Sequence, residues 1–330
     1  MTSSLPSAKV VPGHLPDSIE DAVERLRSGR LVGLPTETVY GLAASTFDAD
    51  AITAVYRAKS RPADNPLIAH VSRLDVARSL TSAWNAAAER LAQACWPGPV
   101  TLVLPRADDV PAASAGGQDS IAIRMPAHPV ALRLLEAFGR PISAPSANPS
   151  GSLSPTEARH VLADFTTLDL LILDGGPSRV GLESTVVDVR DPDHPVVLRP
   201  GGVDRTRIST ILGRPVDVAE STSQSASPGS TARHYAPDVT TRMCTIEEAG
   251  GERSAVITIG QKPGLALGRG EPLFRVDLPA EPDLAASLLY SSLHAADFSG
   301  AERIDLVPPP KEPAWEAVHD RINRATVEGG

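Results

Sequence analysis

Two cations on a short, proline-rich segment are the first residues of this sequence that could do chemistry. Lys59 and Arg61 come at the end of an expected helix in "YRAKSRPADNPLIAH", and Asn65 and His70 follow within nine residues of Arg61. An Arg side chain offers a fork of donors and a Lys side chain a point charge, so together they suit a polyphosphate. The alternative is a cation pair that complements the negative end of the helix dipole, and this segment alone leaves both interpretations open.

Two further arginines stand in apolar strands, where an unpaired charge is costly to bury. In "SIAIRMP", Arg124 shares one strand face with Ser120. Arg124 therefore forms a structural ion pair with an acid or binds a ligand carboxylate. Arg199 ends the strand in "VLRPGG", next to a Gly pair that lets a ligand approach the backbone closely.

Hydroxyl-bearing side chains stand beside two of the expected strands. "GLPTETVYGLAA" puts Thr36, Glu37 and Thr38 directly after a buried strand, which is where α/β proteins often build sites. The alternative is a turn in which the hydroxyls bond their own backbone, and the segment alone favours that turn. Ser184 and Thr185 open the strand in "LESTVVDV".

A serine-rich loop in "SAPSANPSGSLSPTEA" is the strongest local signal. Its polar residues crowd a segment rich in Pro and Gly: Ser143, Ser146, Asn148, Ser150 and Ser154. The sequence predicts a following helix with Ser154 as N-cap, Pro155 at its first position and Glu157 at its third. Such a loop at a helix N-terminus suits an anion, and ordinary capping is the alternative, although Ser154 can do both.

The elements that must position these residues alternate between helix and strand in the first half of the chain. Apolar periodicity predicts helices at 17–29, 48–60, 129–138 and 155–165, and strands at 30–35, 67–71, 100–104, 120–124, 169–174, 184–189 and 196–200. A possible capping box, Asp17 with Glu20, starts the first helix. Because strands cluster toward the end of this region, we expect an α/β fold with a mixed, twisted sheet.

The composition changes near residue 218, where "AESTSQSASPGS" has almost no apolar content. We therefore predict a first domain at 1–217, a linker at 218–237 and a second, smaller α/β domain at 238–330. In the second domain the pattern predicts strands at 255–260, 273–278 and 303–307, and helices at 283–300 and 314–326.

Charge and composition exclude several classes of protein. A formal net charge of -9 argues against a chain that coats nucleic acid. Cys95 and Cys244 lie far apart, so neither a disulfide framework nor a zinc site is supported. No signal peptide and no long apolar run is visible, so a cytoplasmic protein without a membrane span is expected. Neither of the common glycine-rich nucleotide loops is present.

Seven segments together resemble a known family, the Sua5/YrdC/YciO family. In chain order they are "PTETVYGL", "KSR" with "NPLIAH", "SIAIRMP", "SAPSAN", "ESTVVD", "LRPGG" and "SPGSTARHYAP". The resemblance covers roughly residues 15 to 215 and the linker. The linker motif and the second domain resemble the longer Sua5 branch, the threonylcarbamoyl-AMP synthases.

The resemblance implies a reaction in which L-threonine, bicarbonate or CO2, and ATP give L-threonylcarbamoyl-AMP and pyrophosphate. The product would serve the N6-threonylcarbamoyl modification of adenosine 37 in tRNAs that read codons beginning with A. The implied fold is the YrdC-like twisted open sheet with a large cavity, followed by a Rossmann-like C-terminal domain. Mg2+ would come with ATP, since no carboxylate cluster reads as a metal site. A downstream tRNA threonylcarbamoyl transferase complex is the implied partner, and direct tRNA binding is compatible but not required.

The resemblance also assigns residues. Catalytic roles fall on Lys59, Arg61, His70 and Arg124. The ATP positions are Lys59, Arg61, Asn65, Ser120, Ser146, Asn148, Ser154, Arg199, His234 and Tyr235. The threonine positions are Thr36 or Thr38, His70, Arg124, the backbone near Ala144, and Ser184. His234 and Tyr235 belong to the linker motif, which we predict to act as a lid that keeps water from the labile adenylate.

Two other functions remain as alternatives to the synthase. One is a module that binds tRNA or double-stranded RNA, against which the 4% aromatic content and the acidic balance weigh. The other is a YciO-like relative without synthase activity, against which the intact "KSR", "SAN" and linker motifs argue. Pyrophosphate release that needs threonine and bicarbonate together would distinguish the enzyme from both.

Overall fold

The computed structural model describes residues 7–219 and 235–326. Contacts divide the chain into two units. Unit 1 comprises Met1–Ser150, Pro155–Ser178 and Glu183–Ser230, and unit 2 comprises Gly151–Ser154, Arg179–Leu182 and Thr231–Gly330. Within the described ranges, no helix has the length and apolar character that crossing a membrane requires.

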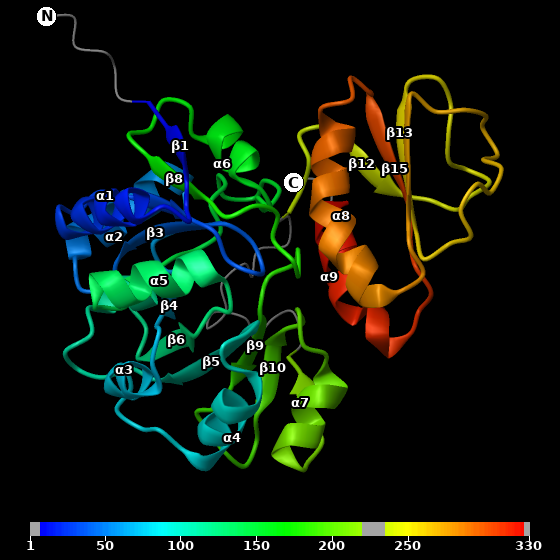
Figure 1. The fold of residues 1–330 in the computed structure, drawn as a ribbon. Coiled ribbons are helices and arrows are strands. Elements are labelled where there is room, and N and C mark those ends of the chain that lie inside the picture. The colour runs from blue at the N-terminus through cyan, green and yellow to red at the C-terminus, as the bar shows by residue number, and fades with distance from the viewer. Residues whose placement is uncertain (1–6, 220–234, 327–330) are drawn as a thin grey trace, which may run out of the picture. The chain divides into compact units, whose positions relative to one another are not determined.

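Unit 1 is built on one mixed sheet, which among the described residues has eleven strands in the order β1-β8-β2-β3-β7-β4-β6-β5-β9-β10-β11 (Figure 1). The strands are β1 Lys9–Pro12, β2 Val32–Leu34, β3 Gly41–Ser45, β4 Ile68–His70, β5 Val100–Pro105, β6 Ser120–Arg124, β7 Ile142–Ser143, β8 Leu171–Asp174, β9 Thr185–Asp188, β10 Val196–Arg199 and β11 Asp217–Val218. β4 pairs with β6 in parallel, whereas β5 pairs with β6 antiparallel. The predicted mixed α/β sheet is confirmed.

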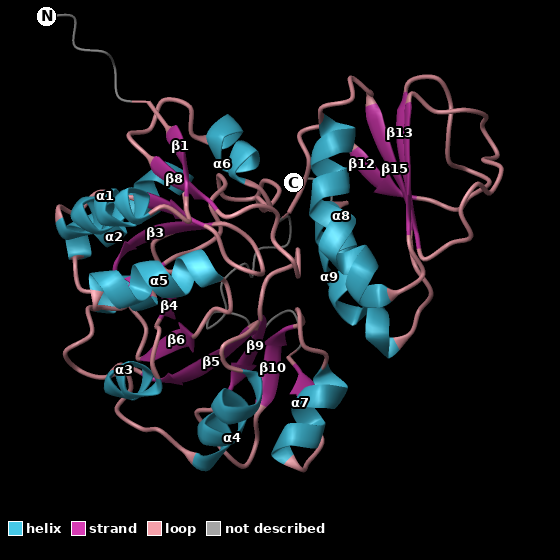
Figure 2. Cartoon of the chain, viewed as in Figure 1, coloured by secondary structure: helices cyan, strands magenta, loops and turns pink. Residues whose placement is uncertain are grey.

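Helices cover both faces of this sheet (Figure 2). They are α1 Pro16–Arg27, α2 Ala49–Lys59, α3 Leu74–Ser79, α4 Ala86–Cys95, α5 Pro129–Phe138, α6 Ala158–Asp164 and α7 Arg205–Leu212. Strand β8 shows why both faces are apolar: Leu171 and Leu173 pack with α1 and α5, while Ile172 packs with α2 and α6. Alternate residues of a strand point to opposite faces, so a strand covered on both sides is apolar throughout.

Two of the predicted helix starts are wrong. Helix α1 begins after Leu15 with Pro16 at its first position and has no side-chain cap, so the Asp17–Glu20 capping box does not form. Helix α6 begins only at Ala158, so Ser154 is not its N-cap. The reason is tertiary pairing: Tyr40 N donates to Pro155 O at 2.8 Å, which holds the preceding residues out of the helix.

Unit 2 contains a parallel sheet whose strands, in the described part of the chain, lie in the order β12-β15-β13-β14. The strands are β12 Thr241–Met243, β13 Ser254–Ile259, β14 Phe274–Leu278 and β15 Arg303–Val307, and the helices are α8 Pro282–Asp297 and α9 Glu316–Ala325. Figure 1 shows α8 and α9 beside each other against this sheet. The sequence predicted all of these elements except β12, and the α/β character expected of the second domain is confirmed.

Candidate active site

A buried ion pair joins Arg124 to Glu37 in unit 1. Arg124 Nη2 lies 2.6 Å from Glu37 Oε1, and each side chain is only 3% exposed. Arg124 Nη1 donates to Thr38 Oγ1 at 2.8 Å, and Nε donates to the Gly98 carbonyl at 3.2 Å. Burial alone would raise the pKa of the Glu37 carboxyl, but the charge and hydrogen bond of Arg124 turn the shift downward. The structural ion pair with an acid, one of the two interpretations of Arg124, is therefore present, and the acid is Glu37.

Glu37 is the residue that the site prediction missed. It stands between the two predicted threonine-site hydroxyls, and it is 2% exposed. An acid in a buried turn requires a cation, and an arginine in an apolar strand requires an acid. Those two requirements, taken together, would have paired Glu37 with Arg124.

The structure distinguishes Thr36 from Thr38. Thr36 Oγ1 donates to Val39 O at 2.6 Å and accepts from the backbone N–H groups of Thr38 and Val39, so its hydroxyl closes a local turn. The Thr38 hydroxyl instead accepts from Arg124. The local turn predicted as the alternative for this segment is therefore present at Thr36. The hydroxyl that contacts the Arg124 guanidinium is that of Thr38.

His70 lies beside Arg124, because the two residues are register partners of the parallel strands β4 and β6. His70 Nδ1 is 3.1 Å from the Ile68 carbonyl, which can only accept, so Nδ1 carries the proton and Nε2 holds a lone pair. Burial, with a further contribution from the Arg124 charge, lowers the pKa of His70 to about 3. The imidazole is therefore neutral at neutral pH.

The pKa of His70 predicts a dependence of stability on pH. Its folded pKa of about 3 lies below its ordinary value of 6.5, so between these values the unfolded chain binds more protons. The contribution of His70 to the free energy of unfolding is then fully present above pH 6.5. It is lost as the pH drops, by up to about 1.4 kcal/mol per pH unit. His70→Asn, whose amide can donate to Ile68 O, is expected to remove this slope in urea unfolding. His194→Asn, at an 83% exposed side chain, is the matched control. Parallel curves for wild type and His70→Asn would contradict the prediction.

Lys59 and the loop after β7 form a second buried group. Lys59 ends helix α2 and donates from Nζ to the backbone oxygens of Ser146, at 2.6 Å, and Asn148. The side chain is 1% exposed. Burial, reinforced by the Arg61 charge, holds the pKa of Lys59 well below its usual value. Three predicted ATP positions are therefore in direct contact.

Arg61 forms a compact loop with the residues that follow it. Its Nε donates to Asn65 O at 3.1 Å, and its Nη2 donates to the Asn65 side-chain oxygen and to Pro66 O. The turn begins at Ser60, which takes a left-handed conformation with φ of 51° at the end of α2. The predicted ATP residues Arg61 and Asn65 thus fix each other, next to Lys59.

Arg199, the last residue of β10, forms hydrogen bonds to Ser184, which directly precedes β9. Its Nη2 donates to the Ser184 backbone oxygen at 3.0 Å and to the hydroxyl at 3.2 Å. The Ser184 hydroxyl also bonds Thr101 Oγ1 at 2.7 Å. A Cβ at Gly201, in the Gly pair after Arg199, would lie 2.3 Å from Glu183 O, and the predicted approach of a ligand to this pair stays a prediction. The close approach there is made by the chain itself.

The remaining predicted residues lie as follows. Ser120 is buried in β6 and its hydroxyl lies 3.5 Å from the Gln118 side-chain oxygen. The Ala144 N–H donates to Ile68 O at 3.0 Å, so it is used within the sheet. Ser154 and Tyr235 belong to unit 2, where Tyr235 packs its ring against Tyr290. His234 lies outside the described residues, as does most of the predicted lid.

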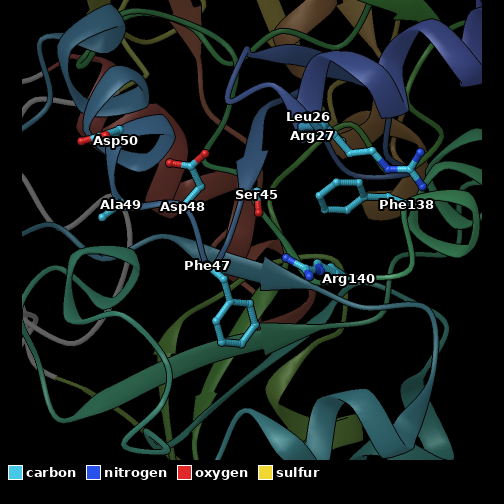
Figure 3. Close-up of a pocket in the computed structure, with 9 residues that line it drawn as sticks. All are labelled: Leu26, Arg27, Ser45, Phe47, Asp48, Ala49, Asp50, Phe138 and Arg140. Atoms are coloured by element: carbon cyan, nitrogen blue, oxygen red, sulfur yellow. The ribbon is translucent and has the colours of Figure 1, made fainter.

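A cavity of about 670 Å3 lies elsewhere in unit 1 and contains none of these residues (Figure 3). It is lined by Leu26, Arg27, Ser45, Phe47, Asp48, Ala49, Asp50, Phe138 and Arg140. Within residues 7–219 and 235–326, no group of three or more His, Cys, Asp or Glu side chains lies close enough together to hold a metal ion. Neither observation identifies a dedicated metal site within the described residues.

Two family profiles match successive parts of the chain, and they meet near residue 202, before the boundary between the two units. The profile of the Sua5, YciO and YrdC proteins, described as "Telomere recombination", matches residues 24–201. A profile described as "Threonylcarbamoyl-AMP synthase, C-terminal domain" matches residues 203–327. Because the first match covers more than half of the sequence, the chain belongs to the Sua5/YciO/YrdC family.

The relatives narrow the class to one enzyme. The Bacillus subtilis threonylcarbamoyl-AMP synthase is 36% identical over 93% of this chain and 92% of its own length. The Pyrococcus abyssi enzyme of the same name is 47% identical over 64% of this chain, which corresponds to 63% of that protein's length. The predicted family, with threonylcarbamoyl-AMP synthase as its enzyme class, is confirmed.

Solved structures of P. abyssi Sua5 share the fold over nearly the whole chain. Its complex with L-threonine matches 97% of this chain and 97% of that chain, with 36% identity and a TM-score of 0.86. A variant with a His and a Tyr replaced by Ala (H234A/Y235A in that chain) matches 97% of this chain and 96% of that chain, with 35% identity and a TM-score of 0.87. The two-domain fold predicted from the sequence is confirmed by this similarity.

Proposed function

We propose that the Arg124–Glu37–Thr38 group binds L-threonine and that the Lys59–Arg61 group binds the phosphates of ATP. The chain would then make L-threonylcarbamoyl-AMP from L-threonine, bicarbonate or CO2, and ATP, with release of pyrophosphate. The observation that carries the proposal is the guanidinium of Arg124. Its three hydrogen-bonding or ionic partners leave two of its five N–H groups without a partner among the described residues.

Those two N–H groups could donate to the threonine carboxylate as a charge-assisted pair. Glu37 and Thr38 hold the guanidinium in place through its two terminal nitrogens. The complex of P. abyssi Sua5 with L-threonine supports threonine as the ligand. The structure and the family thus favour the ligand interpretation of Arg124 in addition to the ion pair.

His70 is suited to orient the substrate. An imidazole with a pKa of about 3 is a weak base, so it is poorly placed to take a proton from the threonine ammonium. Its Nε2 lone pair can instead accept a hydrogen bond from the threonine hydroxyl or amine. Of the two roles that the sequence left open for His70, we propose the orienting one.

The chemistry then needs no covalent intermediate with the protein. The threonine amine attacks the carbon of CO2, forms the N–C bond and loses a proton to water. An oxygen of the resulting carbamate attacks the α-phosphorus of ATP, and the bond from that phosphorus to the β-phosphate bridging oxygen breaks. Lys59 and Arg61 would neutralise the leaving pyrophosphate, so catalysis is positioning plus charge stabilisation.

Mg2+ would arrive with ATP and neutralise the phosphates, since the described residues offer no carboxylate cage for it. The product would pass to a tRNA threonylcarbamoyl transferase complex for N6-threonylcarbamoyladenosine synthesis. We place the activity in the cytoplasm, where tRNA is modified, with direct tRNA binding not required. The lid role of His234 and Tyr235 stays a prediction.

The direct test is mass spectrometry of a reaction that contains the purified chain, ATP, L-threonine, bicarbonate and Mg2+. We expect threonylcarbamoyl-AMP and pyrophosphate in equal amounts, and neither product when threonine or bicarbonate is left out. Folded protein that binds ATP but forms no adenylate under these conditions would overturn the proposal.

A further inference from the structure

Helix α8 of unit 2 holds a loop that carries a predicted ATP residue. The loop Gly151–Ser154 belongs to unit 2 by its contacts. His294, in the last turn of α8, places Nε2 3.2 Å from the Ser154 carbonyl oxygen. A carbonyl only accepts, so Nε2 carries the proton and donates. The His294 side chain is buried, with 6% of the residue exposed.

The other end of the same loop is also fixed within unit 2. Ala236 N donates to Gly151 O at 3.0 Å, and Ser152 forms a parallel bridge with Ala236. Ala236 follows Tyr235, whose ring centroid lies 5.8 Å from that of Tyr290 in α8. The loop is therefore bonded to α8 directly at its last residue, and at its first residue to Ala236, which follows a tyrosine packed on α8.

Tyr235 adopts a left-handed backbone conformation, which the packing around its ring stabilises. Its φ is 62°, which costs energy for a residue other than glycine. The Arg321 guanidinium of α9 lies 5.0 Å from the centre of its ring, and the residue is 1% exposed. The packing of this ring thus determines where Ala236, and with it Gly151, can lie.

A second loop of unit 2, Arg179–Leu182, meets α8 at Gly181. Gly181 has φ of 69°, and a Cβ there would lie 2.4 Å from Ser287 O and 2.6 Å from Ser287 Cα. The backbone of α8 therefore passes directly against Gly181. This loop leads in sequence to Ser184, a predicted threonine position.

We propose that α8 is a positioning element of the synthase and that His294, through its hydrogen bond to the Ser154 carbonyl, orients Ser154 for ATP. The inference rests on the proposed function, in which Ser154 contacts ATP. Fixing the carbonyl fixes the peptide plane between Ser154 and Pro155, and so holds in place the backbone from which the Ser154 hydroxyl projects. His294 acts through Ser154, so it is a positioning residue and its loss changes ATP use before threonine use.

The test uses the full chain with three variants. His294→Leu removes the donor, whereas His294→Gln keeps a side-chain N–H at a similar reach. We expect His294→Leu to raise the KM for ATP about fivefold to tenfold, with the KM for threonine changed less than twofold, because one hydrogen bond is lost. His294→Gln is expected to stay within about twofold of wild type. The matched control is His319→Leu, since the half-buried His319 also bonds a carbonyl, Pro310 O at 3.0 Å, but that hydrogen bond is exposed to solvent.

Backbone hydrogen exchange gives a readout that does not depend on activity. We expect His294→Leu to speed exchange in a peptide containing residues 151–154, and His319→Leu to leave it unchanged. An unchanged KM for ATP, or equal increases for ATP and threonine, would overturn the inference while the synthase proposal stands. A wild-type chain that makes no adenylate would overturn the synthase proposal, and the exchange experiment would still decide whether His294 holds the loop.

A second pair of variants protects the test against a failure of His294→Leu to fold. Gly181→Ala adds a methyl group against Ser287, and Gly300→Ala is its control, because Gly300 has φ of 82° with open space around it. We expect Gly181→Ala to lower kcat/KM at least tenfold more than Gly300→Ala, since misplaced site residues are costly. Equal losses in the two variants would count against α8 as a positioning element.

Discussion

Arg124→Ala is expected to lower kcat/KM for L-threonine about a hundredfold to a thousandfold, with the KM for ATP changed less than threefold. The reason is that the variant loses the charge-assisted donors proposed for the threonine carboxylate. It is also expected to lower the free energy of unfolding by about 3 to 5 kcal/mol, because Glu37 is left as a buried charge without its partner. Steady-state pyrophosphate release and urea unfolding measure the two effects.

A double variant separates these two roles of Arg124. Glu37→Leu with Arg124→Leu removes both charges, so we expect stability to return toward that of wild type. Threonine use should stay lost, since the guanidinium is still absent. Calorimetry in which Arg124→Ala weakens ATP and threonine equally would show that the assignment of Arg124 to threonine is wrong.

Lys59→Met is expected to have the largest effect on ATP. We predict a loss of about a hundredfold to a thousandfold in kcat/KM for ATP, as for other removals of a preorganised charge-stabilising group. Stability should change by less than about 1 kcal/mol, because losing the bonds to Ser146 O and Asn148 O is offset by relief of a buried charge.

The matched control for this variant is Lys9→Met, at an exposed lysine of the same unit. It should leave both the KM for ATP and the turnover unchanged. If Lys59→Met raised the KM for threonine alone, the phosphate role of Lys59 would be refuted. Pyrophosphate release at varied ATP and varied threonine distinguishes these results.

The regular elements could be predicted because their signals are local. The alternation in "SIAIR" predicted β6, and the apolar stripe before Lys59 predicted α2. The start of α6 could not be predicted, because the backbone of Pro155 pairs with Tyr40, more than a hundred residues earlier. Propensity for a cap at Ser154 is a weak preference, and tertiary hydrogen bonds override it.

The site was predictable in its cations but not in their partners. Lysine and arginine in apolar surroundings are visible in a sequence, and Lys59, Arg124 and Arg199 are all buried. The groups that hold them are mostly backbone oxygens, as at Ser146, Asn148 and Gly98. Every residue carries a backbone carbonyl, so the sequence does not indicate which carbonyl accepts the hydrogen bond. Glu37 is the acidic side chain among the partners described above, and its pairing with Arg124 depends on the order of strands in the sheet.

The contact between Thr38 and Arg124 has a consequence for the order of folding. The two residues are separated by 86 positions, so their hydrogen bond closes a long loop. The entropy cost of closing that loop favours formation of this contact late in folding. Before the middle of the sheet is assembled, the Arg124 guanidinium is not yet beside the Thr38 hydroxyl. The proposed binding site for the substrate L-threonine is then not yet formed. Threonine would therefore bind only the finished fold, and its presence should draw the last step of folding forward by mass action.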